Sequence, residues 1–153
     1  MRLVLTESIA APIGVVYQVY TDLRRAPVIV SSIHSVDIVG SGPIGKGTRF
    51  RETRSIGGKE TTSDMVVTEF DPKRSLTIEG EVGGHALRTA YVFTSSGGRT
   101  QVEMTRTATP TSLGARLSSF LEKGAVKAQL ERDQAELAAA CVEQAKRKEK
   151  DAR

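Results

Sequence analysis

From residue 33 to residue 104 the chain repeats one pattern, in which a short segment of alternating apolar and polar residues is followed by a turn rich in glycine or proline. Alternation with a period of two is typical of β-strands that bury one face, and short turns join neighbouring antiparallel strands. The interruptions fall at 40–47, 57–58, 71–73, 83–84 and 97–98. This pattern predicts six consecutive strands that pair as an antiparallel meander.

Further elements are expected before the meander. Residues 2–9 are rich in β-forming side chains and predict a first strand. Pro12 stands where the first turn of a helix tolerates proline, and a short helix is expected over 12–23. Its apolar stripe consists of Val15, Val16, Val19 and Tyr20. Residues 24–30 are expected to form a second short helix, which Pro27 could open.

The segment after Pro110 contains no further proline, and Thr111 or Ser112 can cap a helix there. Apolar residues then recur at helical spacing, which predicts one helix over 112–144, roughly 50 Å long at about 1.5 Å per residue. A helix of that length has to lie across the sheet to bury its apolar stripe. The last residues, 145–153, are polar, and we expect this basic tail to fray.

The length of 153 residues predicts one domain, which we assign to 1–144, with 145–153 as the tail. A hydrophobic fraction of 39%, together with 14 glycines, lies in the ordinary range for a folded domain. The net charge of +4 is too small to indicate nucleic acid as a partner. The single cysteine, Cys141, argues against a disulfide scaffold and excludes a multi-cysteine zinc site, and we expect it to be a small buried hydrophobe.

The sequence also bears on compartment and cofactors. No run of about 18 apolar residues is present, so no membrane span is expected. Arg2 and Glu7 enclose a short apolar run that is too small for the core of a signal peptide, and we expect a cytoplasmic protein. No HxxxH or CxxC motif occurs, and Gly40, Gly42 and Gly45 join two strands instead of opening a helix. We therefore expect neither a metal nor another cofactor.

Three stretches carry a resemblance to a known superfamily. They are residues 11–17, which begin Ala-Pro, residues 45–50 with the sequence GKGTRF, and residues 67–76 with the sequence VTEFDPKRSL. Together with the order of elements, they resemble the SRPBCC superfamily (START/Bet v 1-like), and within it the polyketide cyclase/dehydrase-like branch, over residues 1–144. The resemblance implies an α+β helix-grip fold, in which a curved antiparallel sheet of about seven strands wraps around the long C-terminal helix, with one or two short helices after the first strand.

The superfamily encloses a hydrophobic cavity between sheet and helix, so the resemblance implies that this chain binds a hydrophobic small molecule. Three loops are expected around the cavity mouth, at 55–58, 83–87 and 107–112. The expected ligand-binding residues on the sheet side are Phe50, Met65, Val67, Ile78, His85, Leu87, Tyr91, Phe93 and Met104. Those on the helix are Leu117, Phe120, Leu121 and Gly124. The alternative is that these side chains fill a solid core, but the small Gly124 makes the helix face thin and favours an open cavity.

Charged residues that share the inward faces are the weak catalytic candidates: Glu52, His85 and Arg106. An inward arginine could bind a carboxylate, phenolate or phosphate of an otherwise apolar ligand, or could form an ion pair at the exposed rim. Glu52, desolvated by Phe50 and Tyr91, could act as a general acid or base in a ring closure. His85 could equally be an exposed loop residue.

Function is expected to follow from the cavity. We expect a carrier or sensor for a lipid, polyketide or isoprenoid-like molecule, because the sequence offers no catalytic triad, metal set or cofactor loop. The alternatives are a cyclase/dehydratase-type enzyme without metal or nucleotide cofactor, which could act by positioning a reactive chain, and a protein-interaction module that uses the long helix. We expect a monomer or homodimer that binds no nucleic acid, with a solvated face at Arg49 and Arg51 that lacks aromatic partners.

Overall fold

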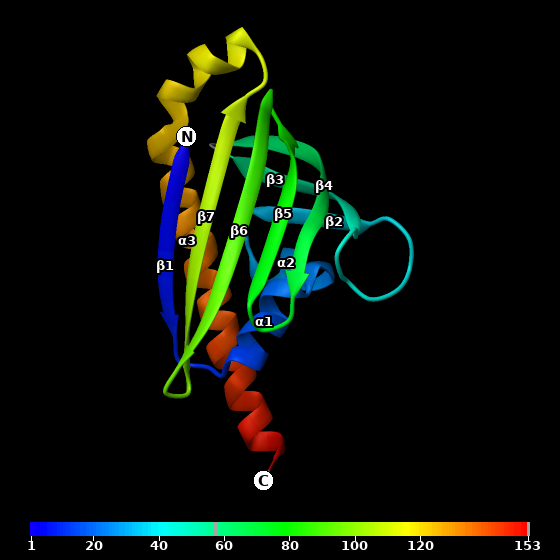
Figure 1. Cartoon of the computed structure of the whole chain (residues 1–153), viewed down its shortest axis with the longest axis vertical. Coiled ribbons are helices and arrows are strands. Elements are labelled where there is room, and N and C mark those ends of the chain that lie inside the picture. The colour runs from blue at the N-terminus through cyan, green and yellow to red at the C-terminus, as the bar shows by residue number, and fades with distance from the viewer. Residues whose placement is uncertain (57, 153) are drawn as a thin grey trace.

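The computed structural model describes residues 1–56 and 58–152, except for the side chains of 116–123. In these residues, seven antiparallel strands form one sheet in the order β1-β7-β6-β5-β4-β3-β2 (Figure 1). The strands are β1 (Arg2–Ile9), β2 (Ile33–Ile38), β3 (Arg49–Ile56), β4 (Lys59–Asp71), β5 (Ser75–Val82), β6 (His85–Ser96) and β7 (Arg99–Pro110). The predicted meander of six strands is confirmed, and the first strand pairs with the last.

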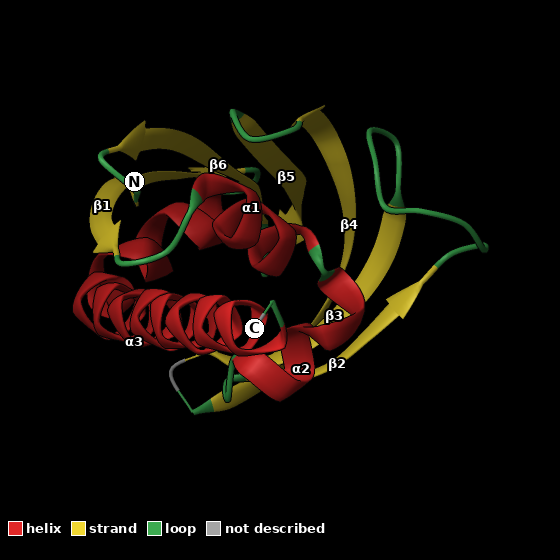
Figure 2. Cartoon of the chain, turned by 90° about the horizontal axis from the view of Figure 1, so that it is seen from below, coloured by secondary structure: helices red, strands yellow, loops and turns green. Residues whose placement is uncertain are grey.

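Tight turns and bulges shape the sheet. Gly83 and Gly84 between β5 and β6 have φ angles of 54° and 78°, a left-handed conformation that glycine adopts without a steric penalty. Register shifts occur in β4 between Val67 and Glu69 and in β2 between Ile33 and Ser35. Such bulges bend and twist the strand that carries them. The sheet therefore curls around the helices, as the view along the long axis shows (Figure 2).

The helices lie on the concave side of the sheet (Figure 2). They are α1 (Ile13–Thr21), the 3-10 turn η1 (Leu23–Arg25), α2 (Ala26–Ile29) and α3 (Leu113–Asp151). The predicted helix after the first strand is thus divided into α1 and η1, while the helix opened by Pro27 is the single turn α2. Ser112 caps α3, because its Oγ accepts a hydrogen bond from the Ala115 amide at 3.2 Å.

The C-terminal helix is longer than its sequence indicates, since α3 continues past Gln144 to Asp151. Two contacts support this extension. Ala145 packs against the core, and the Lys148 Nζ donates a hydrogen bond to Gln18 Oε1 on α1 at 3.0 Å. The residues expected to fray are therefore helical to Asp151, and one of them, Lys148, contacts a residue that is distant in sequence. No helix in the described part of the chain is both long and apolar enough to span a membrane.

The hydrophobic core occupies the end of the molecule where α1 and the second half of α3 meet the sheet. Tyr17 and Tyr20 of α1 each contact Phe93 edge to face, with ring centroids 5.1 and 5.4 Å apart. Val16 and Leu76 are completely buried beside them. Edge-to-face aromatic packing of this kind fills space densely. This end of the space between sheet and helix is therefore filled by protein side chains.

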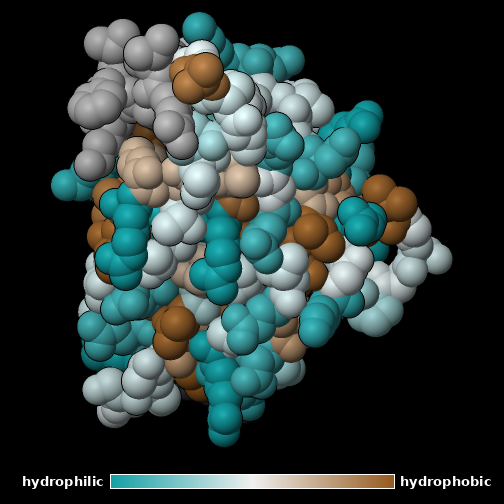
Figure 3. Space-filling model, turned by 45° about the horizontal axis from the view of Figure 1, so that its top comes forward, coloured by the Kyte–Doolittle hydropathy of each residue, from teal (hydrophilic) through white to brown (hydrophobic). Residues whose placement is uncertain are grey.

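The outer face of the sheet is mostly hydrophilic, with hydrophobic residues scattered over it (Figure 3). Arg49 and Arg51 are exposed there, as predicted, and Arg51 pairs with Asp64 at 2.9 Å. Of the large apolar residues on this face, Val92 is 49% exposed and Val4 40% exposed. Isolated exposures of this kind are ordinary for a protein surface.

Cys141 should be unreactive in the folded protein. It is 0% exposed, and burial raises the pKa of its thiol from 9.0 to about 12, so that the reactive thiolate is scarce at neutral pH. We expect the native protein to react with a disulfide reagent at pH 8 at least roughly a hundredfold more slowly than the urea-unfolded chain. Because the pKa is higher in the folded than in the unfolded protein, the neutral Cys141 thiol also contributes to the free energy of unfolding. This contribution is complete below about pH 9 and is lost as the pH rises towards 12. A native thiol that reacted at the unfolded rate would contradict the burial.

Candidate functional site

A cavity of about 390 Å³ lies at the opposite end of the sheet, between the inner faces of the strands and the first half of α3. Strands β3 and β4 contribute Arg54, Ile56, Lys59 and Thr61, and the β5–β6 hairpin contributes Val82, Gly83, His85 and Leu87. The remaining described lining residues are Met1, Arg106, Ala108, Pro110, Val126, Gln129 and Leu130. Its volume is within the range of about 300–1,000 Å³ typical of small-molecule sites.

Strand alternation decides which side chains face the cavity. His85 and Leu87 on β6 pair with Pro110 and Ala108 on β7, so these four residues share the inner face. Leu87 and Ala108 make the middle of this wall apolar. One step further along the strands, Arg106 Nε donates a hydrogen bond to Thr89 Oγ1 at 3.1 Å. The cavity wall therefore changes from a histidine at one end, through an apolar stretch, to an arginine at the other.

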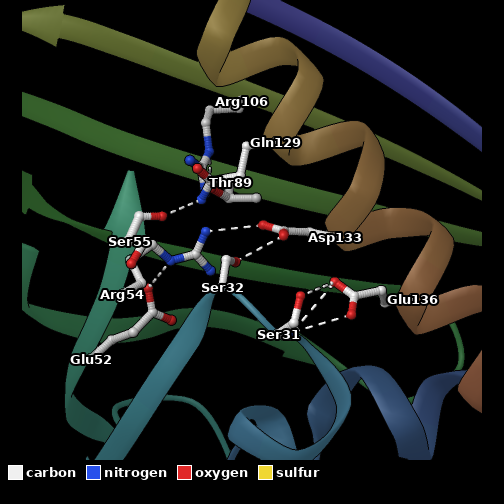
Figure 4. Close-up of polar contacts among 10 residues, drawn as sticks. All are labelled: Ser31, Ser32, Glu52, Arg54, Ser55, Thr89, Arg106, Gln129, Asp133 and Glu136. Atoms are coloured by element: carbon white, nitrogen blue, oxygen red, sulfur yellow. Dashed lines mark hydrogen bonds and ion pairs between the residues drawn. The ribbon is translucent and has the colours of Figure 1, made fainter. Parts of the chain in front are cut away.

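Arg54 is the centre of a buried ionic cluster beside the cavity (Figure 4). Its Nε donates to Glu52 Oε1 at 2.7 Å, and its Nη1 donates to Asp133 Oδ2 at 3.1 Å. The three side chains are only 12%, 14% and 6% exposed, respectively. Desolvation lowers the pKa of Arg54, but the two carboxylates more than offset this effect, and the net pKa is raised. The cluster ties β3 to α3, and with two carboxylates against one guanidinium its formal charge is −1.

Two side chains extend this link between the sheet and α3. Ser32 Oγ donates to the second oxygen of Asp133 at 2.8 Å, and the Gln129 side-chain amide donates to the backbone carbonyl of Ser55 (Figure 4). The Asp133 carboxylate is therefore held on both oxygens, and the helix is hydrogen-bonded to the end of β3. These contacts hold one wall of the cavity in place.

Arg106 differs from Arg54 in that it has no carboxylate partner. In the described part of the chain it forms no ion pair, and its hydrogen bond to Thr89 uses Nε alone. Burial, and then repulsion by the neighbouring Arg54, lower the pKa of Arg106. A guanidinium nevertheless stays charged in a protein. Arg106 is therefore a cation in the cavity wall that pairs with no carboxylate in the described part of the chain, although Glu52 and Asp133 of the neighbouring cluster partly offset its charge.

One ring nitrogen of His85 is a buried hydrogen-bond acceptor. Its Nδ1 lies 3.1 Å from the Gly83 carbonyl, so the neutral ring carries its proton on Nδ1 and donates it to that oxygen. Its Nε2 is buried and has no hydrogen-bond partner among the described residues. His34, by contrast, is exposed and contacts Glu60 and Ser55 outside the cavity lining. Of the two histidines, His85 is the one at the cavity.

Two of the three expected mouth loops, 83–87 and 107–112, are described completely, and they are hydrogen-bonded to each other. The amide and the hydroxyl of Thr111 both donate to the Gly84 carbonyl at 2.7 Å. A Cβ added at Gly84 would lie 3.2 Å from the Ala115 Cβ, so the small residue permits this close approach. Gly57 of the third mouth loop lies outside the described residues, but Ile56 and Lys59 beside it line the cavity.

The structure separates the residues that the sequence placed in one ligand-binding wall. Of these, His85 and Leu87 line the cavity, and so does Arg106, which is one of the predicted catalytic candidates. Those that pack in or on the hydrophobic core instead are Phe50, Met65, Val67, Ile78, Tyr91, Phe93 and Met104. Phe50 and Met65 also border a second hollow of about 580 Å³, between β3, β4 and Val39. The aromatic side chains of α1 cause this separation, because they occupy the space beneath the lower half of the sheet.

The remaining predicted residues lie elsewhere. Glu52 belongs to the ionic cluster, where Arg54 holds it as a carboxylate acceptor. Gly124 is exposed, with open space where a side chain would begin. The predictions for Leu117, Phe120 and Leu121 fall on side chains outside the described part of the structure.

Sequence reasoning missed several lining residues. Val82, Ala108 and Pro110 follow the same alternation that identified Leu87, and extending the period along each strand would have found them. Gln129 and Asp133 are polar residues four positions apart on the inner side of α3, a spacing that places them on one helix face. No group of three or more His, Cys, Asp or Glu residues in the described part of the chain could hold a metal ion.

Comparison with solved structures places the fold among several proteins of low sequence identity. The protein TTHA0849 from Thermus thermophilus has a TM-score of 0.78 at 21% identity, with 93% of this chain and 97% of that chain covered. The Zhui aromatase/cyclase from Streptomyces sp. R1128 has a TM-score of 0.77 at 19% identity, with coverages of 96% and 94%. The ginseng (Panax ginseng) major latex-like protein 151 has a TM-score of 0.70 at 14% identity, with coverages of 91% and 95%.

These likenesses show the helix-grip fold that the resemblance implied. A search of curated protein sequences finds no match. The family model described as "Polyketide cyclase / dehydrase and lipid transport" matches residues 2–146, almost the whole chain. The chain therefore belongs to this family of polyketide cyclases, dehydrases and lipid transport proteins, within the SRPBCC superfamily.

Proposed function

We propose that this protein binds a hydrophobic small molecule, of lipid, polyketide or isoprenoid type, in the cavity between the upper half of the sheet and α3, as a carrier or sensor. The observation that supports this most directly is the cavity itself, about 390 Å³ in volume, with the apolar residues Leu87 and Ala108 in its middle. A few polar groups at the ends of an otherwise apolar pocket are typical of sites that orient a ligand. The family includes proteins of lipid transport, which is consistent with this role.

One observation favours a second candidate, a cyclase/dehydratase-type enzyme. The unpartnered Nε2 of His85 is an acceptor that could take a proton from a bound ligand. Glu52 fits that role less well, because its carboxylate is already hydrogen-bonded to Arg54. A carrier would release its ligand unchanged after incubation, whereas an enzyme would release a product such as the dehydrated molecule, and mass spectrometry of the extracted ligand distinguishes the two.

The cavity assignment is tested by filling the cavity. We expect Leu87→Trp to weaken binding of N-phenyl-1-naphthylamine, a neutral dye that fluoresces in apolar sites, by tenfold or more, because the larger ring occupies the apolar middle of the cavity. The matched control is Ala86→Trp, which places the same ring at the adjacent exposed position on the other face of β6. Fluorescence titration of the wild-type protein and both variants measures the effect.

Two results would count against the proposal. One is a wild-type protein that does not bind the dye, and the other is a folded Leu87→Trp variant that binds it as well as Ala86→Trp does. Circular dichroism of both variants establishes that each is folded.

A further inference from the structure

We propose that the cavity ligand is an organic carboxylic acid whose carboxylate binds Arg106, an inference that rests on the proposed function. Three features of the site lead to it: the cations of the cavity wall, the free donors of Arg106, and the number of guanidinium groups that are available to an anion. Each is independent of the apolar character that supports binding as such.

The cavity wall is positively charged. Its described lining contains the cations Arg54, Lys59, Arg106 and the N-terminal ammonium of Met1, and no carboxylate. Lys59 is exposed to solvent, and Arg54 is paired with Glu52 and Asp133 just outside the lining. The Met1 ammonium donates a hydrogen bond to the Ala108 carbonyl at 2.8 Å. Arg106 is the only arginine of the described wall that pairs with no carboxylate, and it is half-buried. A charge in such a position is costly unless something compensates it, and a ligand anion would do so.

Arg106 also has the geometry to receive a carboxylate. Its Nε is used by Thr89, which fixes the direction of the side chain along the wall (Figure 4). The two terminal nitrogens have no protein partner in the described part of the chain. A guanidinium presents these donors in a planar fork that matches the two oxygens of a carboxylate. The apolar residues next to it along the wall, Ala108 and Leu87, would contact the body of the same molecule.

The number of charges favours a carboxylate over a phosphate. Arg106 is the one guanidinium of the described wall whose terminal donors are free, since Arg54 is held by two carboxylates, and one guanidinium can match one negative charge. A phosphate monoester carries close to two charges at neutral pH, so one would remain buried without a partner. We therefore expect a ligand with an apolar body and a single acidic group.

The experiment compares acids with neutral amides of the same shape. Isothermal titration calorimetry would measure binding of decanoic acid against decanamide, and of 2-naphthoic acid against 2-naphthamide, so that one linear and one aromatic body are tested. In at least one pair we expect the wild-type protein to bind the acid about ten- to a hundredfold more tightly than the amide. Decyl phosphate, tested beside decanoic acid, is expected to bind more weakly than the carboxylate.

Variants assign the effect to Arg106. We expect Arg106→Met to lose the preference for the acid while binding the amide within about threefold of the wild type, because only the charge-assisted hydrogen bonds are removed. The control is Arg88→Met, which removes an exposed arginine from the outer face of β6 and should retain the preference. Circular dichroism and the neutral dye establish that each variant is folded and retains its cavity.

The possible outcomes separate the two proposals. If acid and amide bind equally in both pairs, the carboxylate inference is wrong while the cavity function stands. If neither member of either pair binds, both are wrong. Tighter binding of decyl phosphate than of decanoic acid would replace the carboxylate by a phosphate, and an acid preference that persists in Arg106→Met would show that another group binds the anion.

Discussion

Replacing Arg54 with methionine is expected to lower the free energy of unfolding by about 3–5 kcal/mol, because the change leaves two buried carboxylates without their cation. Glu52 and Asp133 are only 14% and 6% exposed, and each is hydrogen-bonded to Arg54. Removing one partner of a buried ionic cluster costs far more than the cluster contributes as a whole. Urea denaturation followed by circular dichroism measures the change.

Two further variants make this prediction specific. Arg51 lies on the outer face of β3, the strand that also carries Arg54, and forms an exposed ion pair with Asp64 of β4. Arg51→Met removes this pair and should leave the urea midpoint almost unchanged. Combining Arg54→Met with Glu52→Gln and Asp133→Asn removes the uncompensated charges and should recover most of the lost stability. An Arg54→Met variant as stable as Arg51→Met would show that the ionic cluster is not desolvated as the structure indicates.

Replacing Arg106 with methionine is expected to have the opposite effect to Arg54→Met and to raise the free energy of unfolding of the ligand-free protein by about 1–2 kcal/mol. Burial and the neighbouring Arg54 lower the pKa of Arg106, which means that the fold disfavours its charge. Methionine keeps much of the apolar contact and removes that cost. The loss of the hydrogen bond to Thr89 makes the gain smaller, and Thr89→Val in the same chain should restore it.

Opposite effects of Arg54→Met and Arg106→Met on stability would support a role for Arg106 in ligand binding. A residue that lowers stability in the ligand-free protein but binds the ligand is typical of a binding site, where function is retained at a cost in stability. Arg88→Met on the outer face of β6 serves as the control and should leave the urea midpoint almost unchanged. If Arg106→Met instead destabilised the protein as much as Arg54→Met, the Arg106 charge would be compensated by the protein and the carboxylate inference would lose its basis.

Much of the fold was predictable because it depends on local patterns. Alternation identified Leu87, Tyr91 and Phe93 as residues of one inner face, and the glycine pairs marked the turns. The long helix was predictable from the absence of proline after Pro110, but its end was not. It continues to Asp151, and within this extension Lys148 contacts Gln18, a residue 130 positions earlier in the chain, which no local pattern predicts.

Local patterns along the chain were enough to predict the order of the elements, the inward faces of the strands and the family, because each of these follows from residues that are neighbours in the chain. The position of the cavity along that inner face depends on contacts that form only in three dimensions. Tyr17 and Tyr20 fill the lower half by packing on Phe93, and Asp133 balances Arg54, from which it is separated by 79 positions. Arg106 is thereby left without a carboxylate in direct contact among the described residues. Packing and charge balance depend on residues that are distant in sequence and meet only on folding, so the periodicity of the sequence does not predict them.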